Sequence, residues 1–147
     1  MRNYELRITN YELRVYNEFL FPSFLRTVVG FIGTSNQSDF RPQWNARFLR
    51  DGRDAFFDFY RTQIDDLPLR LSEMFVLERR GYIVSSDLSQ AIIPLLDRLD
   101  SSVRDRVNIV VNEGGVLIGY CIDEQDIESK AHQMWFIDDR SPNRLHE

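Results

Sequence analysis

Three aspartates recur at helical spacing in the segment DGRDAFFDF, which covers residues 51 to 59. Asp51, Asp54 and Asp58 are separated by three and four residues and would share one face of a helix. Such a carboxylate ridge can bind a metal ion when another helix adds ligands. Arginines flank the ridge, so ion pairs within the helix explain the pattern, and we expect no metal. These arginines are Arg47, Arg50 and Arg61.

The other reactive side chains do not match a known catalytic or metal-binding spacing. His132 and His146 lie fourteen residues apart, and with Cys121 they do not form a zinc pattern. The acidic run DEQDIE lacks the glycine and ligand spacing of a calcium loop. The sequence contains neither G-x-G-x-x-G nor G-x-x-x-x-G-K-[ST], and its sole lysine, Lys130, follows no glycine loop. We therefore expect no catalytic residue, no metal and no cofactor.

Composition indicates a folded cytoplasmic protein. Apolar residues make up 43% of the chain, and the formal net charge is −5. Seventeen of the eighteen basic residues are arginine, but the net charge provides no overall attraction for nucleic acid or an anionic membrane. Cys121 is the only cysteine, so no internal disulfide can form. The most apolar run, residues 19–33, is broken by Pro22 and Arg26 and is too short to cross a bilayer.

The stretch LSEMFVLERRGYIVSS, residues 71–86, resembles the end of a recognition helix and the first wing strand of a winged-helix domain. Sequences of the form L-x-x-R-G-[YLW]-I are common at that junction. The resemblance covers sixteen residues and implies a DNA-binding regulator. Arg70, Arg79 and Arg80 would then contact phosphates.

The first sixteen residues contain a near-copy, with Asn3–Thr9 repeated as Asn10–Tyr16. Apolar and polar residues alternate in each copy as in a strand, but a seven-residue period also suits a helix. We divide the chain into a repeat-derived arm, residues 1–16, and a single domain, residues 17–147.

Hydrophobic periodicity predicts mainly helices, followed by a hairpin. Glycines in NEGG would supply the positive φ angles of the hairpin loop. Gly81 would take the left-handed position after a helix, and Gly52 would weaken another helix from inside. The predicted helices cover about 22–29, 42–64, 69–80, part of 85–106, and 123–132. The predicted strands are YIVS (82–85), the hairpin 107–122, and a strand near 133–137.

This order favours an α+β fold, in which a small antiparallel sheet packs against several amphipathic helices. In the last strand Trp135 and Met134 would point to opposite faces, which leaves one of them for a protein partner. We assign partner binding to Trp135, Met134, Arg79 and Arg80. The predicted function is a small non-catalytic interaction or regulatory protein that forms a homodimer. The alternatives are a winged-helix DNA-binding regulator and an enzyme without a local motif.

Overall fold

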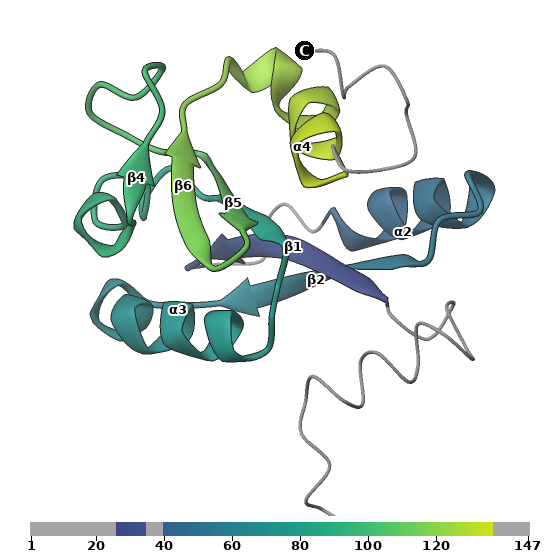
Figure 1. Cartoon of the computed structure of the whole chain (residues 1–147), viewed down its shortest axis with the longest axis horizontal. Helices are drawn as coiled ribbons and strands as arrows, with labels where there is room; N and C mark the ends of the chain where they lie inside the picture. Colours follow the sequence, from purple (N-terminus) through teal and green to yellow (C-terminus); the bar gives the residue numbers. More distant parts are fainter. Residues whose placement is uncertain (1–25, 35–39, 137–147) are drawn as a thin grey trace, which may run out of the picture.

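The computed structural model describes residues 26–34 and 40–136, which form one six-stranded mixed sheet with helices on both faces (Figure 1). The strands lie in the order β2-β1-β3-β5-β6-β4. Their bounds are β1 Thr27–Gly33, β2 Ala55–Arg61, β3 Gly81–Val84, β4 Arg98–Leu99, β5 Ile109–Glu113 and β6 Val116–Tyr120. The helices are α2 Arg41–Arg50, α3 Leu67–Val76 and α4 Ile127–Trp135, with short 3₁₀ turns at Ile64–Asp66, Ile93–Leu95 and Glu124–Asp126.

The sheet is mostly parallel, because β1 runs parallel to β2 and β3, and β4 runs parallel to β6. Only β5 is antiparallel to its neighbours, β3 and β6. The prediction of a small antiparallel sheet in an α+β fold is therefore wrong, and the chain has an α/β fold. The hairpin predicted over 107–122 is present as β5 and β6, but it is one part of a larger sheet.

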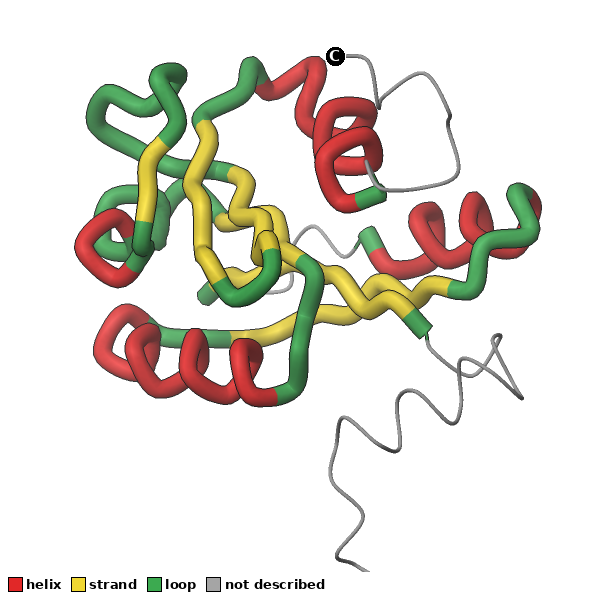
Figure 2. The backbone as a smooth tube through the Cα atoms, viewed as in Figure 1, coloured by secondary structure: helices red, strands yellow, loops and turns green. Residues whose placement is uncertain are grey.

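Two apolar clusters lie on opposite faces of the sheet. Trp44 and Phe48 of α2 pack with Trp135 of α4 on one face. Leu71 and Met74 of α3 pack with other apolar side chains on the opposite face. Figure 2 shows α3 on one side of the strands, with α2 and α4 on the other. The described residues thus form three layers, helix, sheet and helix.

Strand β1 replaces the C-terminal part of the helix predicted over residues 22–29. Val29 and Phe31 face one cluster and Ile32 faces the other, so the strand is covered on both faces. A parallel strand buried on both faces has a nearly continuous apolar sequence, TVVGFIG, and periodicity cannot separate it from a buried helix. The part of that predicted helix before Arg26 lies outside the described residues.

The helix predicted over 42–64 ends at Arg50, and the aromatic residues after it form β2. Gly52 has a φ of +66° and follows the C-cap residue, so it ends the helix instead of weakening it. The side chain of Asn45, from α2, contacts β2. Its amide nitrogen donates to the Phe57 carbonyl at 3.0 Å, and its oxygen accepts from the Phe57 N–H at 2.7 Å.

Two further predictions are corrected in the C-terminal half. Residues 85–106 form turns, a 3₁₀ turn and β4 instead of a long helix, and Pro94 lies within the 3₁₀ turn. The strand predicted near 133–137 is instead the end of α4, which continues to Trp135. The helix predicted over 69–80 is confirmed as α3 with different bounds, and YIVS is confirmed as β3 with a shifted start. The arm, residues 1–16, lies outside the described residues.

Candidate functional site

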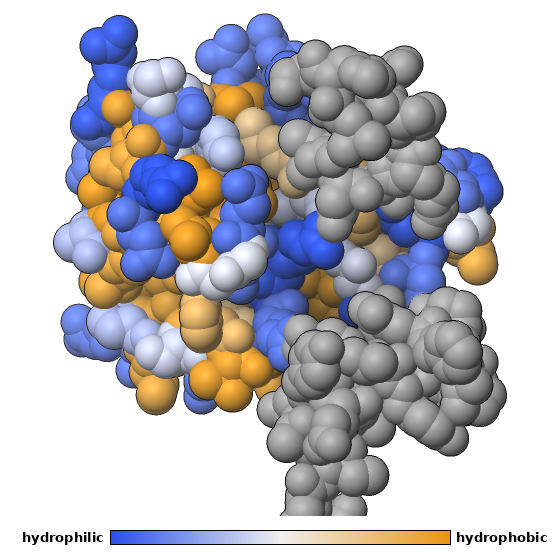
Figure 3. Space-filling view, in the orientation of Figure 1, coloured by the Kyte–Doolittle hydropathy of each residue, from blue (hydrophilic) through white to orange (hydrophobic). Residues whose placement is uncertain are grey.

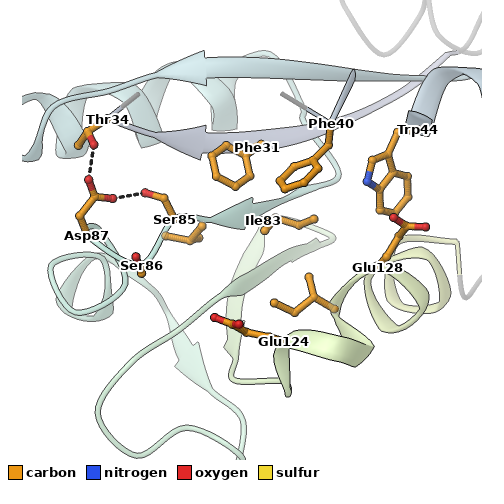
Figure 4. A pocket seen from close by; sticks show the side chains of 12 residues that line it. Phe31, Thr34, Phe40, Trp44, Ile83, Ser85, Ser86, Asp87, Glu124 and Glu128 are labelled. Atoms are coloured by element: carbon orange, nitrogen blue, oxygen red, sulfur yellow. Dashed lines mark hydrogen bonds between the residues drawn. The ribbon is translucent and has the colours of Figure 1, made fainter. Parts of the chain in front are cut away.

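A cavity of about 620 Å³ opens beyond the carboxyl ends of β1 and β3 (Figure 4). Strand β2 lies on one side of β1, and β3 lies on the other. The chain that leaves β1 and the chain that leaves β3 therefore diverge, which is the switch point where open α/β sheets bind ligands. Thr34 follows β1, and Ser85, Ser86 and Asp87 follow β3.

Asp87 is held at the cavity by two hydroxyl groups from different strand ends. Thr34 Oγ1 donates a hydrogen bond to one carboxylate oxygen, and Ser85 Oγ donates to the other. These bonds, first from Ser85 and then from Thr34, favour the ionised form and lower the pKa of Asp87. Each oxygen keeps a lone pair for another donor, so Asp87 can still accept a hydrogen bond from a ligand hydroxyl.

The backbone fixes the two strand ends that carry these hydroxyls. The N–H of Ser85 donates to the Ile32 carbonyl at 2.9 Å, and the N–H of Thr62 donates to the Gly33 carbonyl at 2.7 Å. Both bonds join the last residues of β1 to the segments that follow β2 and β3. Asp87, Ser85 and Thr34 are therefore positioned before a ligand arrives.

One wall of the cavity is aromatic. Phe31 of β1 meets Phe40 edge to face, with ring centroids 5.5 Å apart, and it stacks on Phe59 at 5.4 Å. Trp44 of α2 stacks on Phe57 of β2 at 5.0 Å. Phe31, Phe40 and Trp44 all line the cavity. A wall packed in this way offers a rigid surface for the apolar face of a ligand ring.

Two more carboxylates lie at the cavity, one on the 3₁₀ turn before α4 and one in the first turn of α4. Glu124 and Glu128 are exposed and line the cavity beside Ile127. Glu128 lies 3.9 Å from Arg47, whereas no arginine or lysine is among the lining residues within 26–34 and 40–136. The described cavity thus combines hydroxyls, three carboxylates and aromatic rings.

This combination suits a small ligand that carries several hydroxyl groups. The volume falls within the range of about 300–1,000 Å³ that is usual for such pockets. A dinucleotide does not fit these residues, because its phosphates need backbone N–H groups of a glycine-rich loop or basic side chains. The cavity presents Asp87, Glu124 and Glu128 instead.

The residues that the sequence assigned to partner binding lie elsewhere. Trp135 is fully buried, and its indole N–H donates to the Val110 carbonyl at 3.2 Å, so the prediction that it lies at an exposed strand position is wrong. Met134 packs partly buried against the same cluster. Arg80 Nη1 donates to the Trp135 carbonyl at 2.7 Å, at the C-terminal end of α4, and Arg79 Nη1 donates to the Leu77 carbonyl at 3.3 Å.

The winged-helix resemblance does not extend to the structure. Strand β3 follows α3 as in that family, but it pairs with β1 on one side and β5 on the other. It is thus an interior strand of the sheet and not an exposed wing.

The three aspartates do not share one helix face as the sequence suggested, because Asp51 follows α2, Asp54 precedes β2 and Asp58 lies in β2. Asp54 pairs with Arg26 at 3.0 Å and Asp51 lies 3.8 Å from Arg47. Within residues 26–34 and 40–136, no group of three His, Cys, Asp or Glu side chains is placed to hold a metal ion. Over the same residues, no helix has the length and apolar content needed to cross a membrane.

Sequence reasoning missed Thr34, Ser85 and Asp87 because it depended on motifs within single segments. Thr34 lies more than fifty positions before Ser85 and Asp87 in the chain, and only the pairing of β1 with β3 brings it to them. The available signal was that GTS and SSD each follow a short apolar run. That signal has meaning only when both runs are recognised as parallel strands.

The chain is similar to shikimate dehydrogenases in sequence and in fold. The shikimate dehydrogenase (NADP(+)) of Alkaliphilus metalliredigens is 32% identical over 109 residues, which are 72% of this chain and 38% of the relative. The crystal structure of shikimate dehydrogenase from Aquifex aeolicus matches with a TM-score of 0.60 and 26% identity, over 65% of this chain and 37% of that chain. The enzyme from Listeria monocytogenes, solved with shikimate and NAD, matches with a TM-score of 0.64 and 23% identity, over 86% and 40%.

No protein-family model matches the chain. The chain spans between 28% and 38% of the length of three curated relatives that it matches, all of them shikimate dehydrogenases. Since these relatives and the matching structures are enzymes, the comparisons contradict the prediction of a non-catalytic interaction or regulatory protein. Of the three functions derived from the sequence, they favour an enzyme without a local motif.

Proposed function

We propose that this chain is the substrate-binding part of an oxidoreductase similar to shikimate dehydrogenases. In this proposal the cavity between β1 and β3 holds a small ring compound with several hydroxyl groups. We extend the proposal to a cytoplasmic location, which the single cysteine favours.

The observation that carries the proposal is that Asp87 and the aromatic wall line the same cavity. Thr34 and Ser85 hold its carboxylate at the switch point of the sheet, and the lowered pKa keeps it ionised at neutral pH. An ionised carboxylate accepts strong hydrogen bonds from hydroxyl groups. Phe31 and Trp44 offer the apolar surface that the carbon skeleton of such a ring requires.

We assign to the described residues the binding of the compound that is oxidised or reduced, because they include no cradle for a dinucleotide. A nicotinamide dinucleotide would supply hydride acceptance or donation when bound to such an enzyme. Because the cavity is lined by carboxylates, we assign this chain only the steps of binding and orienting the hydroxylated compound.

The proposal is tested by calorimetric titration of the full 147-residue chain with shikimate and, separately, with its methyl ester. We expect at least one of the two probes to bind. The Asp87→Asn variant should bind the uncharged methyl ester about tenfold more weakly, because it loses a charge-assisted hydrogen bond.

Asp105→Asn is the matched control, since Asp105 is an exposed carboxylate outside the cavity lining. It should bind like the unmodified chain. Absence of binding for both probes, or equal affinities for the Asp87 and Asp105 variants, would refute the proposed site.

A further inference from the structure

Among the residues that the structure describes, the charged groups of the cavity lining all have the same sign. Asp87, Glu124 and Glu128 line the cavity, and the described part of the lining includes no lysine or arginine. Glu128 is partly compensated by Arg47 at 3.9 Å, but that arginine also lies 3.8 Å from Asp51. Thr34 and Ser85 hold Asp87 through neutral hydroxyls, which leave its negative charge uncompensated.

Arg41 follows the lining residue Phe40 in the sequence, and its guanidinium contacts a ring outside the described lining. The guanidinium of Arg41 lies over the ring of Phe59, 5.7 Å from its centroid. Phe59 belongs to β2 and stacks behind Phe31, which forms the cavity wall. Arg41 is therefore associated with the ring behind that wall, and it is not among the lining residues.

A ligand with a carboxylate group would meet like charges in this cavity. At a separation of about 4 Å in water, one like charge lowers affinity about fivefold, and the effect grows where water is excluded. A neutral ring with hydroxyl groups avoids this repulsion. It also gains from the carboxylates, since each one accepts hydrogen bonds from hydroxyls.

Resting on the proposed function, we infer that the cavity selects an uncharged polyhydroxylated ring or sugar over a hydroxy acid. The aromatic wall binds both classes alike, because it contacts the ring faces and carries no charge. Discrimination arises from Asp87, Glu124 and Glu128, and Glu124 is the specificity residue that can be altered without touching the Asp87 hydrogen bonds. Shikimate carries a carboxylate, so the preferred ligand differs in charge from the compound named in the similar enzymes.

Shikimate and its methyl ester form a probe pair that differs mainly in this charge. Calorimetric titration of the full chain at low ionic strength should give about tenfold tighter binding of the ester. The ratio should shrink as salt is added, because salt screens charges in an exposed cavity. Equal binding of the two probes, or tighter binding of the acid, overturns the inference but leaves the proposed function in place.

The Glu124→Gln variant tests the cause of the discrimination. It should reduce the ester-to-acid affinity ratio about threefold or more, because one repelling charge is removed. Glu113→Gln is the matched control, since Glu113 is an exposed carboxylate at the end of β5 outside the lining, and its ratio should stay unchanged. If the ester-to-acid affinity ratio is the same in the Glu124→Gln and Glu113→Gln variants, the assignment of the discrimination to the lining carboxylates is overturned. If neither probe binds the unmodified chain, the proposed function fails together with the inference.

Discussion

Tyr82 places a hydroxyl group inside the core beneath α3. The residue is only 2% exposed, and its Oη has no hydrogen-bond partner among the described residues. Burial raises the pKa of this hydroxyl above its ordinary value, because the ionised form cannot be solvated there. A buried polar group without a partner costs about 1–3 kcal/mol relative to water.

The Tyr82→Phe variant should therefore be more stable, by about 1 kcal/mol in the free energy of unfolding. Urea denaturation at neutral pH measures this difference. The variant should also be less sensitive to alkali. With the raised pKa in the folded state, the unfolded chain releases the Tyr82 proton first, so stability falls as pH rises above about 10. A loss of stability in the variant at neutral pH would instead reveal a partner for the hydroxyl.

At the scale of single elements, α2 and α3 end in the same hydrogen-bond pattern with different residues at the critical position. After α2, Gly52 donates to Leu49 and Arg53 donates to Phe48, at 3.2 and 2.9 Å. After α3, Glu78 donates to Phe75 and Arg79 donates to Met74, both at 3.0 Å. These are the paired bonds of a Schellman motif, whose central residue has positive φ. Gly52 has φ +66° and Glu78 has φ +57°.

Exchanging the residue types at these two positions should move stability in opposite directions. Gly52→Ala should cost about 1–2 kcal/mol from the left-handed backbone alone, because a Cβ at Gly52 meets nothing within 4 Å. Glu78→Gly should remove the same kind of strain, with a smaller net gain because Glu78 also makes a side-chain interaction. Gly52→Asn is the control and should lie between Gly and Ala, since Asn tolerates this conformation. Equal stability of the Ala and Gly forms at position 52 would contradict the argument.

Some features of the turns and helix ends could be predicted from the sequence, and others could not. The hairpin loop was predictable, because Gly114 and Gly115 have positive φ, as NEGG indicated. The end of α3 was predicted at Gly81, but Glu78 takes the left-handed position there. Gly81 lies in β3 for a different reason, since a Cβ there would lie 2.2 Å from the Trp135 indole nitrogen. That contact joins residues 54 positions apart, so no local pattern contains it.

The parallel strands were missed because their partners are also distant in sequence. Strand β1 pairs with residues 55–61, which were predicted as helix, and with residues 81–84, which were predicted as a strand without a partner. The candidate site was missed for the same reason, because Asp87 becomes a site residue only beside Thr34. Local sequence patterns were therefore enough to predict the hairpin turn and helix α3. The site at the switch point could not be predicted in this way, because it depends on pairing between strands that are distant in sequence.

At the scale of the whole molecule, one face of the sheet is covered by α2 and α4, and the other is covered by α3 and the chain that follows β3. Apolar side chains remain exposed along α3, where Leu69, Val76 and Leu77 are 64%, 76% and 57% exposed. Figure 3 shows hydrophobic residues over the left half of the molecule and along its lower edge, where α3 lies in Figure 1. The expectation that the protein forms a homodimer stays a prediction, and this face is available for such contact.

The two hydrogen bonds between Asn45 and Phe57 affect whether two molecules can associate through the edges of their sheets. Strand β2 is at the margin of the sheet, where its outward N–H and C=O groups would recruit a strand from another molecule. The Asn45 amide bonds the backbone groups of Phe57 that such a strand would bond. It therefore prevents a strand of another molecule from pairing with β2 at this position. Asn45→Ala should therefore make the chain associate as its concentration rises, as measured by sedimentation velocity. Asn108 bonds Ile122 in the same way beyond the interior strand β6, so Asn108→Ala should weaken the fold without promoting assembly.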